Sequence, residues 1–328
     1  MLQNAIRGTI GAKFPFDDSE AAESLAKVIA SKTDDNKKLE VFRILAQMNN
    51  TQRQMIRTPY KMKYNKDLMT DLVNGLSGDY EDVILALMET PTKYDVLQLN
   101  EAISDTGTNE SLLIEILCLR TGSELIAIKN EYEILTGNKL EVDVTAHTSG
   151  DLKDILLTVI QKPVMTINSV TDMEKIRQEI KKMIGEKKKI DKNAMKRVIS
   201  SLPTYQLSIL ATEYATITGR QIEQDIEKQF NSHAKKALLA LIKYSRNSNS
   251  FFADLLNSSL KNPGRTRDRD LIRLIVSRSE IDLATICEAY VKNYKKKLVE
   301  EISTECEDLI RDCLIAIING NMQNSLLI

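Results

Sequence analysis

The sequence has few of the residues that interrupt helices or carry metal chemistry. Its 328 residues include 12 glycines, 6 prolines, 2 histidines and no tryptophan. So few glycines and prolines cannot supply the tight turns of a many-stranded sheet, which favours an all-α fold. With only His147 and His233, the composition argues against histidine-based catalysis and against a histidine-rich zinc site.

Signals for disulfides, membrane insertion and lipid anchoring are also missing. None of the four cysteines belongs to a Cys-x-x-Cys pair, and three lie in apolar helical stretches, which predicts reduced thiols and a cytosolic address. No apolar run approaches the roughly 20 residues that span a bilayer. The amino terminus lacks a signal-peptide pattern, and Leu2 stands where N-myristoylation requires glycine.

The overall composition is typical of a globular helical protein. Apolar residues make up 42% and charged residues 28% of the chain, which argues against disorder. The net charge of −1 gives no general attraction to nucleic acid or to membranes. We therefore expect no nucleic-acid partner, and any membrane attraction must come from local features.

A group of helical motifs recurs four times along the chain. In residues 121–135, Thr121 and Glu124 form a capping box, and apolar residues follow at helical spacing. Tyrosines recur at intervals of 72, 82 and 76 residues, and Leu or Ile follows each of them eight residues later. The positions are Tyr60, Tyr132, Tyr214 and Tyr290 with Leu68, Leu140, Ile222 and Leu298, and Arg120 and Arg278 lie twelve residues before the second and fourth tyrosines.

This repetition predicts four units of about 70 to 80 residues with about five helices each. In the second unit the loop SDTGTNE, residues 104–110, joins the first two helices. The helices expected in that unit cover about 92–103, 109–119, 123–135, 139–147 and 150–162. The expected boundaries are 1–15 for a short amino-terminal segment, 16–90, 91–164, 165–247 and 248–320 for the repeats, and 321–328 for a carboxy-terminal tail.

The motifs resemble the repeat of the annexin family, and especially its divergent protist branch, the alpha-giardins. The resemblance covers about 16–320 and implies a slightly curved all-α disc of four five-helix repeats. It places on the convex face the loops that join first to second and fourth to fifth helices. The segments that carry it are TGTNE (106–110), LRTGSEL (119–125), YEILTGNKL (132–140), HTSG (147–150) and VSRSEIDL (276–283).

The resemblance further implies calcium-dependent binding to anionic phospholipid. Ca²⁺ prefers about six to eight oxygen ligands; the family supplies three loop carbonyls and a carboxylate at the end of the fourth helix, and lipid phosphate or water fills the rest. The acid position holds Gly75, His147 and Gln229 in the first three repeats, and only the fourth keeps an acid, Glu305. The carbonyl positions are Ile103, Asp105 and Gly107 in the second repeat and Lys261, Pro263 and Arg265 in the fourth.

A lesser family site pairs the carbonyl of the loop threonine with a carboxylate two residues later. Thr108 with Glu110, and Thr266 with Asp268, have this spacing. Both acids would also complement a helix dipole, worth about 0.3–1 kcal/mol each, so the spacing leaves both explanations open. With so few carboxylates per ion, we expect a Kd for calcium on the order of 10⁻⁴ M.

Two basic clusters offer a route to partners that does not need calcium. Between Lys175 and Arg197 there are ten Lys and Arg residues against three Asp and Glu. Lys187, Lys188 and Lys189 are hypothesised to attract lipid headgroups directly, at about 1 kcal/mol per residue, and a merely solvated helix face is the alternative. The second cluster, KNYKKK at 292–297, is expected on the opposite face, where it would meet an acidic protein surface or only keep a helix end soluble.

The sequence therefore predicts a non-enzymatic, peripheral membrane protein that binds calcium and anionic phospholipid and links membrane to cytoskeleton. No nucleophile–base pair, phosphate loop or cluster of metal ligands suggests an enzyme, and no small-molecule substrate is expected. The alternative is a calcium-independent scaffold that binds a cytoskeletal protein through its basic patches. The expected location is the cytoplasm, at the membrane or the cytoskeleton.

Overall fold

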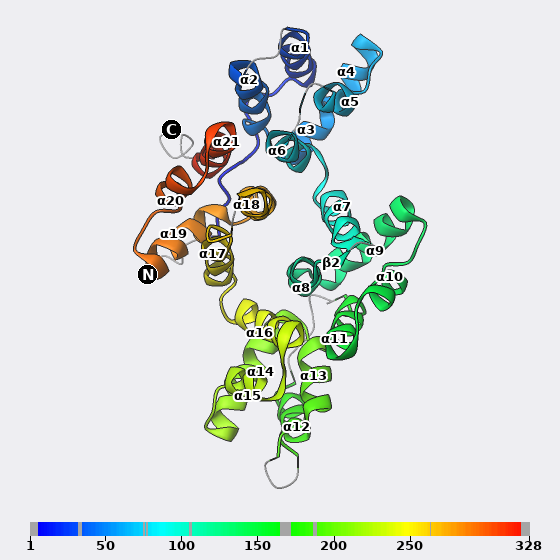
Figure 1. Ribbon diagram of the computed structural model, residues 1–328, viewed down its shortest axis with the longest axis vertical. Helices are drawn as coiled ribbons and strands as arrows, with labels where there is room; N and C mark the ends of the chain where they lie inside the picture. The colour runs from blue at the N-terminus through cyan, green and yellow to red at the C-terminus, as the bar shows by residue number, and fades with distance from the viewer. Residues whose placement is uncertain are drawn as a thin grey trace. The chain divides into compact units, whose positions relative to one another are not determined.

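The computed structural model confirms the all-α fold class (Figure 1). One pair of short antiparallel strands interrupts the helices, with Ile103 opposite Thr108 and Ser104 opposite Gly107. The structure describes residues 6–31, 35–74, 76, 78–104, 107–164, 172–185, 189–262 and 264–322, without the side chains of 35–37, 265–267 and 308.

The chain forms two compact units, and each contains two of the predicted repeats. One unit comprises residues 92–251, which include the second and third repeats. The other comprises 1–91 and 252–328, which include the first and fourth.

The unit of residues 92–251 contains two consecutive sets of helices. The five helices expected in the second repeat are all present, with ends that differ from the predicted ones by at most two residues. The elements are α7 (Pro91–Ala102), β1 (Ile103–Ser104), β2 (Gly107–Thr108), α8 (Glu110–Leu119), α9 (Gly122–Thr136), α10 (Leu140–His147), α11 (Gly150–Ile160), α12 (Met173–Ile184), α13 (Lys192–Ser201), α14 (Thr204–Thr218), α15 (Ile222–Gln229) and α16 (Ser232–Arg246).

Its central contact joins α8 and α16, one helix from each set. In α8 every residue from Leu112 to Leu119 except Glu115 is buried. A helix that is apolar on nearly all sides must lie inside a core, because it has no face suited to water. This packing joins the two repeats into one hydrophobic core.

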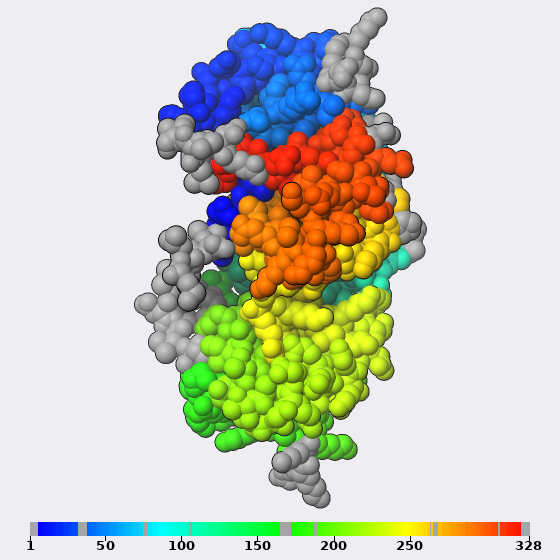
Figure 2. All heavy atoms as spheres, turned by 90° about the vertical axis from the view of Figure 1, so that its left-hand side faces the viewer, coloured from blue at the N-terminus to red at the C-terminus, as the bar shows by residue number. Residues whose placement is uncertain are grey.

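The other unit brings together the two ends of the sequence. Helix α6 packs against α18, and α2 packs against α21, so that the first and fourth repeats share a core. Figure 2 shows the red carboxy-terminal helices directly against the blue amino-terminal ones. The elements are α1 (Asp18–Ile29), α2 (Asp35–Ala46), α3 (Asn50–Met55), α4 (Arg57–Tyr64), α5 (Leu68–Val73), α6 (Asp79–Met88), α17 (Ser248–Ser259), α18 (Gly264–Ser279), α19 (Leu283–Tyr294), α20 (Leu298–Glu305) and α21 (Asp308–Asn319).

Pro59 explains why the first repeat has one more helix than the second. Proline lacks a backbone N–H and its ring crowds the preceding turn. Here the expected third helix is divided into α3 and α4 at Ile56, three residues before Pro59. The interruption of this helix is therefore a local effect of Pro59.

The four repeated tyrosines are all buried, at 2% exposure or less, as core residues should be. Their hydroxyl groups reveal a second regularity. Three of them donate to an aspartate eleven residues later: Tyr60 to Asp71 at 2.8 Å, Tyr132 to Asp143 at 2.9 Å and Tyr214 to Asp225 at 2.8 Å. In the fourth repeat this position holds Glu301, and Tyr290 donates instead to Asn257 over 3.4 Å. In the first three repeats the tyrosine therefore fastens its own helix to the next helix along the chain.

Candidate functional site

The loop SDTGTNE forms a tight hairpin between α7 and α8. The hydroxyl group of Ser104 donates to the carbonyl of Gly107 over 2.8 Å, and Asn109 caps α8 by accepting from the amide of Leu112 at 3.1 Å. Asp105, whose carbonyl was predicted to bind calcium, lies outside the described residues. Ile103 and Gly107 lie on the two paired strands, so their carbonyls are held by a defined backbone.

The same loop lies against the end of α10, where the family has its acidic ligand. The hydroxyl group of Thr108 donates to the backbone carbonyl of His147 over 3.2 Å. The structure therefore brings these two positions together although 39 residues separate them in sequence. A half-buried imidazole occupies the place of the carboxylate, and Glu110, the first residue of α8, is a described acid that ends the loop segment.

The corresponding loop of the fourth repeat is shorter. Helix α17 ends at Ser259 and α18 already begins at Gly264, so Arg265 and Thr266 lie in a helical first turn. A helical carbonyl accepts from the amide four residues later, which leaves it less available to an ion than a loop carbonyl. Lys261 lies in the short turn before the helix. Pro263 and the side chains of Arg265 and Thr266 lie outside the described residues.

The two acids predicted for the fourth repeat lie in different environments. Asp268 is 8% exposed and lies within α18, where it takes part in an interaction with other groups of the protein. Glu305 is the last residue of α20 and is exposed to solvent. Of the two, only Glu305 is placed to meet an ion that arrives from solvent.

Calcium therefore fits these loops only in part. The second repeat has a paired loop backbone at 103–104 and 107–108 with the acid Glu110 beside it, and the fourth has Glu305 beside a loop shortened by the start of a helix. Among the described residues, no group of three or more His, Cys, Asp or Glu side chains could hold a metal ion. A site in either loop would depend on backbone carbonyls, water or lipid for most of the six to eight oxygens or so that Ca²⁺ prefers.

Most of the basic cluster between Lys175 and Arg197 is described, but two of the three lysines proposed to meet lipid are not. Lys189 is exposed, whereas Lys187 and Lys188 are not described. In the second basic run, Lys296 pairs with Glu301 at 2.6 Å, and Lys297 lies 3.8 Å from Glu300. Local acids thus partly neutralise residues 292–297.

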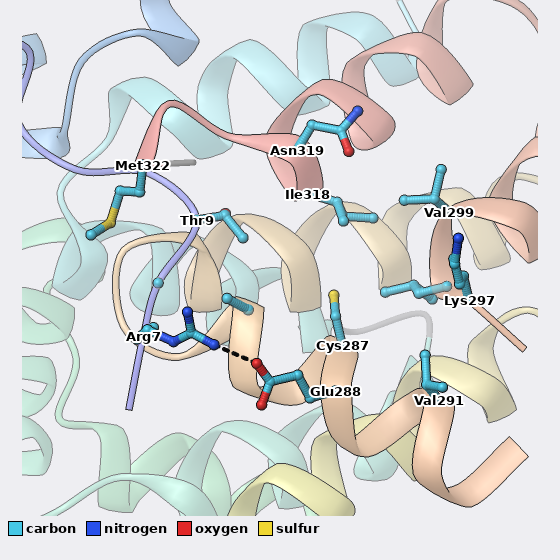
Figure 3. A pocket seen from close by; sticks show the side chains of 13 residues that line it. Arg7, Thr9, Cys287, Glu288, Val291, Lys297, Val299, Ile318, Asn319 and Met322 are labelled. Carbon is cyan, nitrogen blue, oxygen red and sulfur yellow. Dashed lines mark hydrogen bonds and ion pairs between the residues drawn. The ribbon is translucent and has the colours of Figure 1, made fainter. Parts of the chain in front are cut away.

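A pocket of about 480 Å³ lies beside the amino-terminal segment (Figure 3). The backbone there is fixed by the amides of Thr9 and Ile10, which donate to the carbonyl of Ser279 at 2.6 and 3.0 Å. Arg7 forms an ion pair with Glu288 on the wall, and Cys287 projects between them and the apolar side. Burial raises the pKa of the Cys287 thiol to about 12, so this cysteine is a neutral lining group and not a reactive thiolate.

No helix in the described part of the chain is long and apolar enough to cross a bilayer.

Known proteins with this architecture share its sequence as well as its fold. The annexin family model matches residues 20–87, 94–159 and 251–317. Annexin A13 of Mus musculus is 34% identical over 307 residues, which cover 93% of this chain and 96% of that protein. Annexin A7 of Xenopus laevis is 36% identical over 316 residues, 95% of this chain; the chain spans only 61% of that relative, and similarly about three fifths of annexin A11.

Solved structures show the same relationship. Annexin III superposes with a TM-score of 0.88 at 31% identity, covering 96% of this chain and 98% of that one. Calcium-bound annexin (Sm)1 gives 0.85 at 27% identity, covering 96% and 94%. Calcium-bound alpha-14 giardin gives 0.76 at 16% identity, covering 93% and 100%, and shows likeness of fold alone. Annexins are generally non-enzymatic proteins that bind phospholipid in a calcium-dependent manner. From the matched repeats, the sequence identity and the fold together, this chain belongs to the annexin family.

Proposed function

We propose that this annexin binds calcium and anionic phospholipid as a peripheral membrane protein, through loops that each keep part of a site. The observation that carries the proposal is the hydrogen bond from Thr108 to the carbonyl of His147. It places the loop of the second repeat against the helix end from which a fourth-helix ligand would reach a bound ion. The fourth repeat has the equivalent spacing, with Thr266 and Glu305 also 39 residues apart.

The residues proposed to hold calcium differ between the two loops. In the second repeat they are the carbonyls of Ile103, Asp105, Gly107 and Thr108, with the carboxylate of Glu110. In the fourth they are Glu305 with the carbonyls of Lys261, Pro263 and Arg265, and, as a lesser pair, Thr266 with Asp268. The buried, engaged state of Asp268 makes this pair the weakest of the candidates. Affinity should lie at the weak end of the protein range, on the order of 10⁻⁴ M.

We further propose that residues 165–247 form the third repeat, with boundaries at 16–90, 91–164 and 248–320 for the others. This stretch lies between the matched segments 94–159 and 251–317. It supports the proposal by its own helices α12 to α16 and by the Tyr214–Asp225 hydrogen bond that it shares with the first two repeats.

Co-sedimentation with phosphatidylserine vesicles tests the membrane function. We expect the protein to pellet in millimolar calcium and to stay in the supernatant in EGTA. Absence of pelleting in millimolar calcium would contradict the proposal. Equal pelleting in both buffers would favour direct attraction by Lys187, Lys188 and Lys189 over the calcium loops.

A substitution at the fourth repeat tests which loop holds the ion. Glu305→Gln removes a negative charge at an exposed helix end, and we expect it to raise the calcium concentration needed for pelleting. Glu133→Gln on the exposed surface of α9 removes the same charge outside the residues proposed to hold calcium and is the matched control. An unchanged calcium requirement in Glu305→Gln would remove the fourth repeat from the proposal.

A link to the cytoskeleton is the second part of the proposed function. The basic run 292–297 is exposed apart from Tyr294, and local acids only partly neutralise it. We expect it to bind an acidic filament surface, which co-sedimentation with purified actin filaments or microtubules measures. Filament binding without any vesicle binding would instead favour a calcium-independent scaffold.

A further inference from the structure

Three helices begin around a single cavity of about 710 Å³, whose lining residues all lie within 92–251. They are α9, α14 and α17, whose first residues Gly122, Thr204 and Ser248 all line it. The start of a helix carries unpaired amide groups and the equivalent of about half a positive charge. Thr121 and Glu124 cap the start of α9 and Asn247 caps that of α17, whereas α14 has no side-chain cap. The dipoles of the three starts together still favour an anion at the cavity.

A buried lysine lies in the wall of the same cavity. Lys162 is only 8% exposed, and within the described part of the chain its ammonium group has no hydrogen-bond or ion-pair partner. Burial lowers the pKa of Lys162, and the nearby Cys118 thiol is neutral because burial raises its pKa to about 12. A bound anion would supply a counter-charge for this largely buried lysine.

Gly122 explains how the lysine segment is held beside the start of α9. A Cβ atom at this position would lie 2.4 Å from the carbonyl oxygen of Pro163. Only glycine permits so close an approach of the two backbones. Close packing of the two backbones therefore holds the segment of Lys162 and Pro163 beside the start of α9.

The charged residues that line the cavity are basic, and the nearby acids, which include Glu124 on Thr121, stand behind them. Three basic residues line it, and none of its described lining residues is acidic. Arg120 is neutralised by Asp95 at 2.6 Å, and Arg246 by Glu223 at 3.2 Å. Lys162 is the remaining positive charge.

Two further features point to a ligand with hydroxyl or acidic oxygens. Pro203, at the start of α14, provides no side-chain cap for that helix. The carboxamide oxygen of Asn249 is buried and has no hydrogen-bond partner. The wall thus offers donors together with one unused acceptor.

We propose that this cavity binds a phosphate monoester. The phosphoryl oxygens would accept from Lys162 and from the helix starts, and a hydroxyl group of the ligand would donate to Asn249. The proposal is independent of the calcium loops, which involve other residues. The ligand is either a soluble phosphate ester or the headgroup of a phosphomonoester lipid.

Binding of inorganic phosphate, measured by ³¹P line broadening at constant ionic strength, tests the proposal. We expect saturable binding to the full chain in EGTA and a loss of about tenfold or more in affinity in Lys162→Met. Lys139→Met, at an exposed position at the start of α10, changes the net charge equally and should leave affinity within about twofold. No saturable binding to the wild type, or equal loss in both variants, would overturn the proposal.

Ser123→Glu provides a second variant that should fold normally, because an acid in the first turn of α9 suits the helix dipole. Its carboxylate would occupy or repel the anion, and we expect phosphate binding to be lost, whereas Ser123→Ala should keep it. Glycerol 3-phosphate and vesicles with phosphatidic acid, both in EGTA, then distinguish the sources. Binding of either that Lys162→Met abolishes supports the site and identifies its ligand, and binding of neither contradicts it.

Discussion

The second and fourth repeats contain the same motifs but keep opposite parts of a calcium site. In the second, Thr108 of the loop contacts the end of α10, yet His147 stands in place of an acid. In the fourth, Glu305 is present and exposed, yet α18 begins so early that part of the loop is helix. The comparison teaches that carbonyls and carboxylate can be lost separately, because different helices supply them.

The repeated arginine shows a similar divergence. Arg120 reaches across to Asp95 on α7, with contacts of 2.6 and 2.7 Å. Arg278 pairs instead with Asp282, four residues later, and lies 4.5 Å from the centre of the Phe252 ring. Arg120 therefore joins α8 to α7, whereas Arg278 stabilises the turn between α18 and α19 and packs on the ring of Phe252.

The largest difference between the repeats should appear on removal of these aspartates. In the wild type, burial lowers the pKa of the Arg120 guanidinium, but Asp95 more than offsets this effect and raises the pKa overall. Asp95→Asn removes that partner and leaves Arg120 buried and charged. We expect a loss of about 3–5 kcal/mol in the free energy of unfolding, measured by urea denaturation. Asp282→Asn should cost less, about 1.5–3 kcal/mol, because Arg278 retains its contact with Phe252. Equal losses would show that the ring contact contributes nothing.

A carboxylate restored at position 147 should increase the calcium affinity of the loop in the second repeat. His147→Glu places a carboxylate beside the loop of the second repeat, and we expect calcium affinity there to rise roughly tenfold, measured by isothermal titration calorimetry. Thr145→Glu adds the same charge to α10 two residues earlier and is the control. A similar gain in both variants would attribute the effect to general charge and not to coordination.

The buried tyrosines give a smaller but direct comparison. Tyr132→Phe removes a 2.9 Å hydrogen bond to Asp143, and we expect the free energy of unfolding to fall by about 1 kcal/mol. Tyr290→Phe removes a 3.4 Å contact with Asn257, for which we expect less than about 0.5 kcal/mol. Thermal and urea unfolding of the two variants measures both values, and a larger loss for Tyr290→Phe would reverse the ranking.

The smallest change in stability should come from the carboxy-terminal ends of α9 and α19, the helices that contain Tyr132 and Tyr290. Helix α9 ends at Gly137 in the left-handed conformation (φ 76°), and α19 ends at Lys295 in that conformation (φ 61°). A lysine is less favourable there than glycine, so Lys295→Gly should stabilise the fold by about 0.5 kcal/mol. Gly137→Ala should destabilise it by about 1 kcal/mol. Denaturation midpoints check both, and a destabilised Lys295→Gly would contradict the expectation.

Much of the fold could be predicted, because helical spacing and capping are local properties. The helices of the second repeat follow from Thr121, Glu124 and the apolar stripe behind them, and the division of a helix near Pro59 follows from its missing N–H. The pair of strands at 103–104 and 107–108 was not predicted, because strands of two residues each give no periodic pattern in the sequence. The first three tyrosines each have an aspartate eleven residues later. Such a spacing does not by itself indicate the hydrogen bond that the structure shows.

By itself, the sequence determined the all-α class, the recurring tyrosines and the chemistry available in each loop, since these depend on residues near one another in the chain. Only the tertiary structure decided that the first repeat packs with the fourth and the second with the third. It also decided that Thr108 meets His147, and that Lys162 lies unpaired where three helices begin. Such juxtapositions result from the burial of apolar helices such as α8 and α16 against each other, which brings distant residues together without any local sequence signal.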